Sequence, residues 1–335
     1  MAAAKKNPGW PGLFLMAAVF CAILSLTAQR MEGPGLYVTL CQWAVPAFFM
    51  VYGMNALGEG KLALGSVFLN MVLPTFCLLV VWSAVYAIVS HLLGGGGVSL
   101  FGVWNALKAA ALGDTYIHLW ILYPLLGLYL VHPVLQRFAG SASRGEVCYF
   151  LMLCFVVASL LPVWTAFFPD SVIAVLLERL QIHLVLGWTG YYVAGWYFFH
   201  YTISRMSEFI VYGLGILGLM LTVTGDALFG GGSLWQGYTA PGVALTSVAL
   251  CVLFRYVLGV SEERARRQTA YRLGSCAMGI YLAHQLWVLL FDWLGVSALP
   301  IPAVLGVVVF TLIYMLASIP VAWLAGKIPG LGRRL

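Results

Sequence analysis

Apolar runs of about twenty residues recur from one end of this chain to the other, separated by short polar gaps. A helix needs about 20 consecutive apolar residues to cross the hydrocarbon core of a bilayer. Only 8% of the 335 residues are charged, whereas soluble globular chains average about 25%. No gap is long enough to bury a core of its own. The sequence therefore predicts a single all-α membrane domain over residues 1–335.

Ten of these runs have the length of a transmembrane helix. They cover residues 11–28, 36–57, 63–92, 115–137, 147–167, 181–203, 209–226, 240–259, 272–295 and 300–326. The first run follows Lys5 and Lys6, as in a signal peptide, but lacks a convincing small-residue cleavage site, so we expect a retained first helix. We also expect a helix break near Pro162 and a short surface helix at Leu100–Leu112.

The distribution of lysine and arginine predicts the orientation of these helices, because cytoplasmic loops of membrane proteins are enriched in both residues. With ten helices, both termini lie on one side of the membrane. That side collects every lysine and arginine except Arg30, Lys108 and Arg179. We therefore expect both termini to be cytoplasmic and the three longer loops to face outward.

The net charge of +6 does not indicate a nucleic-acid partner, because the charges sit in short gaps between apolar runs. The seven cysteines all lie in or at the edge of apolar segments, and none forms a CxxC pair. Buried cysteine usually behaves as a small hydrophobic residue. The sequence therefore predicts neither a metal site nor a disulfide framework.

The densest run of charge is Glu262–Arg272, between the eighth and ninth predicted helices. One interpretation is an anchor that contacts anionic lipid headgroups on the cytoplasmic side. The other is a docking surface for a cytoplasmic polyphosphate, such as the nucleotide end of coenzyme A, because the planar fork of arginine donates two bonds to phosphate at once. In that interpretation Arg266, Arg267 and Arg272 bind acyl-coenzyme A.

The ninth predicted helix carries polar side chains inside an apolar run: Ser275, Tyr281 and His284. Tyr281 and His284 are three residues apart and share one face of a helix. His284 falls near the middle of the bilayer, where a polar group is costly and needs partners. It is either a functional histidine or a packing histidine bonded to a neighbouring helix.

Asp114 and His118 are four residues apart at the outer end of the fourth predicted helix. A carboxylate beside an imidazole can orient the ring and raise its basicity, as a general base for a hydroxyl requires. The alternative is an interfacial pair that bonds to loops and water. Arg30, one of the three outward basic residues, is a candidate substrate contact.

Several segments, in order along nearly the whole chain, resemble one known family. They are Val45–Gly53 (VPAFFMVYG), Trp82–Tyr86, Tyr116–Pro133 (YIHLWILYPLLGLYLVHP), Gly190–Gly195 (GYYVAG), Tyr238–Phe254, Gly274–Trp287 (GSCAMGIYLAHQLW) and Lys327–Leu331 (KIPGL). The family is that of the acyltransferase-3 proteins, integral membrane enzymes that acylate carbohydrates and related acceptors. His118 and Trp120 match its recurrent His-Leu-Trp.

The resemblance implies a ten-helix bundle in a bacterial inner membrane. Such a protein takes an acyl group, often acetyl, from acyl-coenzyme A and delivers it to a hydroxyl of a surface polysaccharide or glycolipid, with no bound cofactor. We therefore expect catalysis by His284 and His118, with Asp114 orienting the latter. Substrate contacts are expected from Tyr281, Ser275, Trp120 and Arg30.

The first apolar run departs from the family pattern. The family normally carries a basic residue there, followed about eleven positions later by a histidine that is regarded as central to catalysis. Here Leu13–Ala28 contains no ionisable residue except Cys21. Either His118 and His284 carry the reaction, or the chain is an inactive relative that acts as a glycan or lipid-linked-sugar transporter or as a partner in an export complex.

Overall fold

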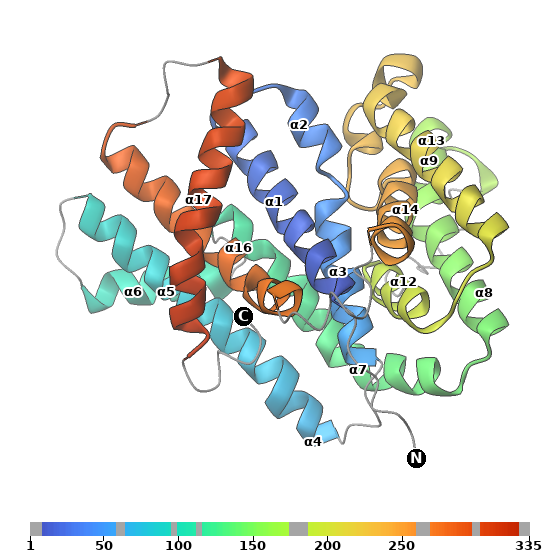
Figure 1. Cartoon of the computed structure of the whole chain (residues 1–335), viewed down its shortest axis with the longest axis horizontal. Helices are drawn as coiled ribbons and strands as arrows, with labels where there is room; N and C mark the ends of the chain where they lie inside the picture. The colour runs from blue at the N-terminus through green and yellow to red at the C-terminus, as the bar shows by residue number, and fades with distance from the viewer. Residues whose placement is uncertain are drawn as a thin grey trace. The chain divides into compact units, whose positions relative to one another are not determined.

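The computed structural model describes residues 9–57, 64–94, 99–111, 116–173, 187–258, 269–296 and 302–327. All regular structure in these ranges is helical (Figure 1), which confirms the predicted all-α class. Each of the ten predicted ranges contains helix. Seven helical stretches are long and apolar enough to cross a membrane, and α14 is a shorter apolar helix. The number of ten crossings and the side of the termini stay predictions.

The first half of the chain alternates long helices with short distorted segments. Its helices are α1 (Trp10–Arg30), α2 (Gly35–Leu40), α3 (Ala44–Leu57), α4 (Leu64–Val67), the π-helix η1 (Phe68–Val72), α5 (Leu73–Leu93), α6 (Leu100–Ala111), the 3₁₀-helix η2 (Ile117–Ile121) and α7 (Leu122–Ser141). The surface helix expected at 100–112 is therefore present as α6.

The second half follows the same pattern. Its helices are α8 (Arg144–Phe155), the π-helix η3 (Val156–Leu160), α9 (Leu161–Phe167), α12 (Thr189–His200), α13 (Arg205–Phe229), the 3₁₀-helix η4 (Gly232–Trp235), α14 (Pro241–Tyr256), α16 (Thr269–Trp293) and α17 (Ala303–Ala325).

Prolines explain where the helices are distorted. Pro162 lies at the start of α9, directly after η3, so the break expected near this residue is confirmed. Pro74 stands in the same relation to η1 and α5. Proline cannot donate the i→i−4 hydrogen bond and its ring crowds the carbonyl of that residue. A π-turn, whose bonds run i→i+5, accommodates the disturbed carbonyls within the helix.

Two other prolines divide helices that we expected to be continuous. The predicted helix over 36–57 is interrupted by a turn at 41–43, because Pro46 lacks the N–H that would bond the carbonyl of Gln42. Likewise Pro124 cannot donate to the carbonyl of Trp120, and the segment before α7 is the 3₁₀-helix η2. His118 therefore lies on a 3₁₀ turn rather than on a regular α-helix.

The chain divides into two compact units. Unit 1 comprises Met1–Cys21, Thr39–Gly58 and Phe138–Ser275, and unit 2 comprises Ala22–Val38, Glu59–Arg137 and Cys276–Leu335. Among the described helices, four contribute residues to both units: α1, α2, α7 and α16. This division does not decide whether residues 1–335 form one domain, and that expectation stays a prediction.

In unit 1 the helices pack through glycine. A Cβ at Gly53 of α3 would overlap the backbone of Tyr192, and a Cβ at Gly195 of α12 would overlap the backbone of Met50. The two helices therefore touch backbone to backbone at two points. Small residues allow this close approach between helices in membranes, where van der Waals packing replaces the hydrophobic driving force.

The helices of unit 1 alternate in direction, and its described arginines gather at one end. The acidic end brings together the end of α9, the start of α12, the end of α13 and the start of α14, through ring contacts of Phe167 and Phe229 with Trp235 and of Trp188 with Tyr238. This end carries Asp170 and Asp226.

The opposite, basic end of unit 1 holds the start of α8, the end of α12, the start of α13 and the end of α14. Arg144 contacts Tyr197 there, and the guanidinium of Arg255 donates to the carbonyls of Phe198 and Tyr201. Every described basic side chain of unit 1 lies at this end: Arg144, Arg205 and Arg255.

Unit 2 contains α5, α6, η2, most of α7, α17, the second half of α1 and most of α16. At one of its ends Arg30 of α1 forms an ion pair with Asp292 of α16. Nearby, the hydroxyl of Tyr37 donates to the carbonyl of Val304 at 3.3 Å. The interior of this unit, between α5, η2 and α16, holds the polar residues described next.

Candidate active site

The two histidines predicted to be catalytic lie next to each other inside unit 2. His118 of η2 is 0% exposed and His284 of α16 is 1% exposed. Their ring centroids are 5.1 Å apart, and the rings are inclined at 75°. The sequence separates these residues by 166 positions, so the fold alone brings them together. Two buried imidazoles at this distance form a polar site within an apolar bundle.

Each imidazole uses one ring nitrogen to bond a backbone carbonyl. Nε2 of His118 lies 3.3 Å from the carbonyl oxygen of Leu282, and Nδ1 of His284 bonds the carbonyl oxygen of Tyr281. A carbonyl oxygen only accepts, so each of these nitrogens must carry the hydrogen. In a neutral ring the other nitrogen then holds a lone pair and can accept a proton. These nitrogens are Nδ1 of His118 and Nε2 of His284.

These two acceptor nitrogens are buried, and among the described residues neither has a hydrogen-bond partner. Buried polar atoms without a partner are rare in folded proteins, and each calls for an explanation such as a bound ligand or water. Here both are of the same kind, because each is the basic nitrogen of an imidazole. The pair can therefore accept a hydrogen from a bound donor, such as a water or a hydroxyl group.

Tyr86 of α5 supports the histidine pair from one side. It is 0% exposed, and its ring lies 4.9 Å from that of His118. Its hydroxyl donates to the same Leu282 carbonyl that accepts from His118. Tyr116 packs on Tyr86 at 4.7 Å and shares a hydrogen bond with Ser90 of α5. These contacts fix η2, and with it His118, against α5 and α16.

Further hydrogen-bond donors without partners lie on the same helices. They are the indole nitrogens of Trp82 and Trp287 and the hydroxyl of Ser83. Trp82 contacts Tyr86 at 5.7 Å, and Trp287 is one turn from His284 on α16. The interior of unit 2 thus combines unsatisfied donors with two unsatisfied basic nitrogens. Such a set suits a ligand that carries both a hydroxyl and a carbonyl oxygen.

Other predicted site residues fall in different places. Tyr281 is buried, with its ring 6.0 Å from that of His118 and 5.6 Å from that of His284. Trp120 lies half-buried in η2. Arg30, by contrast, is engaged in the ion pair with Asp292, so its expected role in binding substrate stays a prediction.

Asp114, Arg266 and Arg267 lie outside the described residues, and Ser275 and Arg272 lie in α16 without described side chains. Their roles stay predictions. His118 lies in the 3₁₀-helix η2, which begins after Tyr116 with its non-helical φ of −54° and ψ of 131°.

Sequence reasoning did not single out Tyr86, Ser83 or Trp82 as site residues. A signal was present, because Ser83, Tyr86 and Ser90 are spaced by three and four residues and so form a polar stripe on an otherwise apolar helix. Their partners gave no signal, since Leu282 and Tyr281 act through backbone carbonyls that every residue type supplies.

Comparison with protein families decides the relationship. A family model described as an acyltransferase domain, Acyl_transf_3, matches residues 6–327. The chain belongs to this family. Searches among curated proteins and among solved structures gave no match. Its described residues hold seven apolar helices of membrane-spanning length, so this acyltransferase-family chain is an integral membrane protein. The buried histidine pair is the strongest candidate for the active site of this acyltransferase domain.

Proposed function

We propose that this protein transfers an acyl group, most simply acetyl, from acyl-coenzyme A to a hydroxyl of a surface polysaccharide or glycolipid, in the inner membrane of a bacterium. The observation that carries the proposal is the histidine pair. Both rings are buried, both are held by backbone carbonyls, and both keep a basic nitrogen without a partner among the described residues.

The reaction follows from the tautomers. The acceptor hydroxyl donates its hydrogen to Nδ1 of His118 or Nε2 of His284, and its oxygen attacks the carbonyl carbon of the thioester. A new C–O bond forms and the C–S bond breaks. The histidine then returns the proton to the departing sulfur, so that the products are an ester and a free thiol. No net proton is gained or lost.

The negative charge that develops on the carbonyl oxygen needs hydrogen-bond donors. Tyr281 and Ser275, expected from the sequence to contact substrate, are candidates for this role. The unpartnered indole nitrogens of Trp82 and Trp287 and the hydroxyl of Ser83 are further candidates. Their burial favours the role, because donors act more strongly on a developing charge where water is excluded.

The proposal is tested by measuring transfer of radiolabelled acetyl from acetyl-coenzyme A to the glycan fraction of membranes that contain His118→Ala or His284→Ala. Loss of a general base lowers the rate by about 100- to 10,000-fold. His91→Ala is the control, because His91 is an exposed histidine at the end of α5. Full transfer by both of the first two variants would refute the mechanism.

A second candidate function has one observation in its favour. Helix α1 holds no ionisable residue except Cys21 and its terminal Arg30, although the resemblance predicts a catalytic histidine there. A chain without that group could serve as a lipid-linked-sugar transporter or as an export-complex partner. Binding of acetyl-coenzyme A to purified protein separates the two functions, because the transporter or partner has no need of it.

A further inference from the structure

One exposed arginine at the basic end of unit 1 is held in place on a tyrosine surface. Arg144 is the first residue of α8, and its Nε donates to the hydroxyl of Tyr197 at 3.1 Å. Its guanidinium carbon lies 5.8 Å from the ring centroid of Tyr197 and 5.7 Å from that of Tyr201. Arginine stacks on such rings through its flat, delocalised cation. The contacts fix a side chain that would otherwise be mobile.

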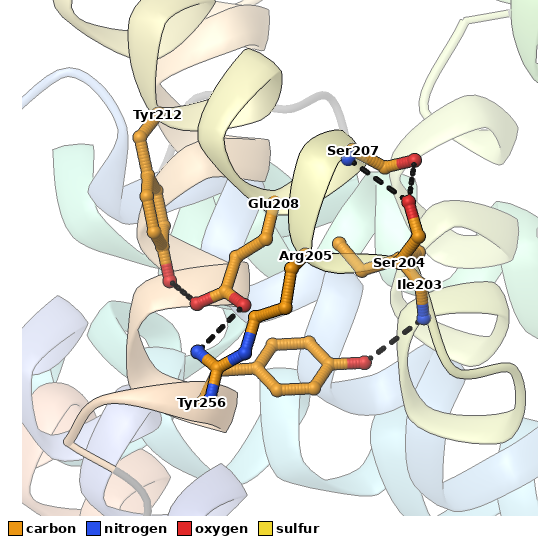
Figure 2. Close-up of polar contacts among 7 residues, drawn as sticks. All are labelled: Ile203, Ser204, Arg205, Ser207, Glu208, Tyr212 and Tyr256. Carbon is orange, nitrogen blue, oxygen red and sulfur yellow. Dashed lines mark hydrogen bonds and ion pairs between the residues drawn. The ribbon is translucent and has the colours of Figure 1, made fainter.

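The other described arginines at this end have different partners. One terminal nitrogen of Arg255 donates to the carbonyls of Phe198 and Tyr201, where α12 ends. Arg205 is 86% exposed and pairs at 3.4 Å with the buried carboxylate of Glu208 (Figure 2). Arg205 therefore already has a counter-ion, and Arg255 is directed toward the backbone at the end of α12.

Arg144 differs from Arg205 because no carboxylate among the described residues lies within ion-pair distance of it. The nearest acidic residue in sequence, Glu146, caps the start of α8 by accepting the backbone N–H of Ser143 at 2.6 Å. The hydrogen bond of Arg144 to Tyr197 uses Nε. The two terminal NH₂ groups of the guanidinium are thus directed by the tyrosines and have no counter-ion in the part of the chain that the structure describes.

An exposed ring lies near this cation. Tyr201 is half-buried and His200 is exposed. The ring of His200 lies 5.0 Å from that of Tyr201, edge to face at 87°, and one of its faces stacks on Trp196 at 5.2 Å, with 9° between the planes. Aromatic side chains of this kind stack on nucleotide bases whatever the base. A fixed arginine near an exposed ring matches a ligand that joins phosphate to a flat heterocycle.

We propose that Arg144, Tyr201 and His200 bind the nucleotide end of the acyl donor, with Arg144 holding a phosphate and the rings holding the base. This rests on the proposed function for the identity of the donor. It places the phosphate contact on α8 and α12, separate from the charge run that contains Arg266 and Arg267. The same end of unit 1 carries all its described basic side chains, which is typical of a cytoplasmic face, where acyl-coenzyme A is found.

The test is calorimetric binding of adenosine 3′,5′-bisphosphate to the purified full chain in phosphatidylcholine nanodiscs. Arg144→Ala is expected to weaken binding by about 10- to 100-fold, the usual cost of a lost charge-assisted contact. Arg144→Lys keeps the charge but not the fork, so its loss is smaller. Tyr201→Leu is expected to weaken binding at least about fivefold through lost stacking.

Arg205→Ala is the matched control, because it removes an arginine of the same end that is already paired with Glu208. Binding is expected to be unchanged in this variant. Equal weakening by Arg144→Ala and Arg205→Ala would overturn the proposal, since it would mean diffuse attraction rather than a site. Each variant must have the same melting temperature as the parent. If Arg144→Ala does not fold, Arg144→Lys serves in its place.

An anionic phospholipid offers the same phosphate chemistry without the base. The melting temperature is therefore compared in nanodiscs with and without phosphatidylglycerol. If the parent gains stability from phosphatidylglycerol, loses that gain on Arg144→Ala and does not bind the bisphosphate, the site takes a lipid headgroup and the proposal is wrong. The expected result is bisphosphate binding that depends on Arg144 in both kinds of nanodisc.

Kinetics separate this proposal from the proposed function. Arg144→Ala is expected to raise KM for acetyl-coenzyme A with little change in kcat, and to leave transfer from S-acetylpantetheine, which lacks the nucleotide, unaffected. If no transfer is seen in the parent but bisphosphate binding still depends on Arg144, the proposed function fails and the nucleotide site stands. If transfer depends on His118 but binding ignores Arg144, only the nucleotide site fails.

Discussion

The two buried imidazoles are held in opposite ways. His118 is tethered through Nε2 to a carbonyl of another helix, and His284 through Nδ1 to the carbonyl one turn before it on its own helix. Each tether leaves the opposite nitrogen as the basic one. A hydrogen bond that fixes one ring nitrogen in this manner sets the tautomer on which general-base catalysis depends.

Tyr86 is expected to act as a positioning residue for His118. Removing its hydroxyl by Tyr86→Phe deletes one of two bonds to the Leu282 carbonyl. A hydrogen bond of this kind contributes about 1 kcal/mol, so acyl transfer is expected to fall by roughly a factor of five in kcat with KM kept. Tyr37→Phe, which removes a similar bond to the carbonyl of Val304, should leave transfer unchanged. Equal rates in the two variants would contradict this role.

The ionisable part of the candidate site could be predicted from the sequence. A histidine deep in an apolar run is costly enough to attract attention, and both His118 and His284 were found in that way. What the sequence could not supply is their distance, because 166 residues separate them. It also could not supply the tethers, because a backbone carbonyl has no residue-type signature. The expected orientation of His118 by Asp114 falls on a residue outside the described ranges and stays a prediction.

At the level of elements, two short motifs prove to be partners. Val45–Gly53 and Gly190–Gly195 were noted separately, each for its resemblance to the family. In the structure they supply the glycines through which α3 and α12 touch. Each glycine admits a backbone segment of the opposite helix, which a side chain would exclude. The pattern in the sequence is therefore a helix contact.

Gly195→Ala is expected to destabilise the protein by about 1–3 kcal/mol, because the added Cβ meets backbone that cannot move aside as a side chain could. Gly213→Ala in α13 is the control, since nothing lies within 4 Å of a Cβ there. In that open helical position alanine is neutral or stabilises by up to about 1 kcal/mol. Thermal unfolding in detergent measures both. A Gly195→Ala variant as stable as Gly213→Ala would contradict the close contact.

The positions of the helices could be predicted, but not all of their breaks. Each of the ten apolar ranges contains helix, and seven helical stretches among the described residues are long enough to span a membrane, since bilayer thickness imposes that length on the sequence. The break at Pro162 was also expected. The turn at 41–43 and the 3₁₀ segment η2 were not, because a proline in the first turn of a helix can equally well sit at the start of an unbroken one. The sequence around Pro46 and Pro124 fits either a broken or an unbroken helix, and only the structure distinguishes the two.

At the level of the molecule, the one-sided distribution of arginine within unit 1 leads to a prediction of orientation. Asp170 and Asp226 lie at one end, and the described arginines lie at the other, together with Glu146 and Glu208. Contacts between helix ends show which residues share an end. This assignment does not depend on how many helices cross the membrane. The basic end should therefore face the cytosol.

Cysteine labelling tests that orientation. In a background with the seven native cysteines replaced, Ser233→Cys at the acidic end should react in intact spheroplasts with a membrane-impermeant maleimide. Ser207→Cys at the basic end should react only after permeabilisation. Both serines are exposed, so a difference in labelling reports the side of the membrane rather than burial. The reverse pattern would place the basic end outside.

The central claim is that the basic nitrogens of His118 and His284, and not their structural bonds, carry out acyl transfer. Isosteric variants separate these roles. In His118→Gln the amide nitrogen replaces Nε2 and can keep the bond to Leu282, whereas in His284→Asn it replaces Nδ1 and can keep the bond to Tyr281. Neither retains a base.

The measurement is the rate of acetyl transfer from acetyl-coenzyme A by purified His118→Gln and His284→Asn. Each variant is first shown to have the melting temperature of the parent protein. We predict that at least one variant, the one whose histidine is the general base, remains folded while its transfer rate falls by about 100-fold or more. Parental rates in both folded variants would show that the histidines only pack and bond, and would contradict the account.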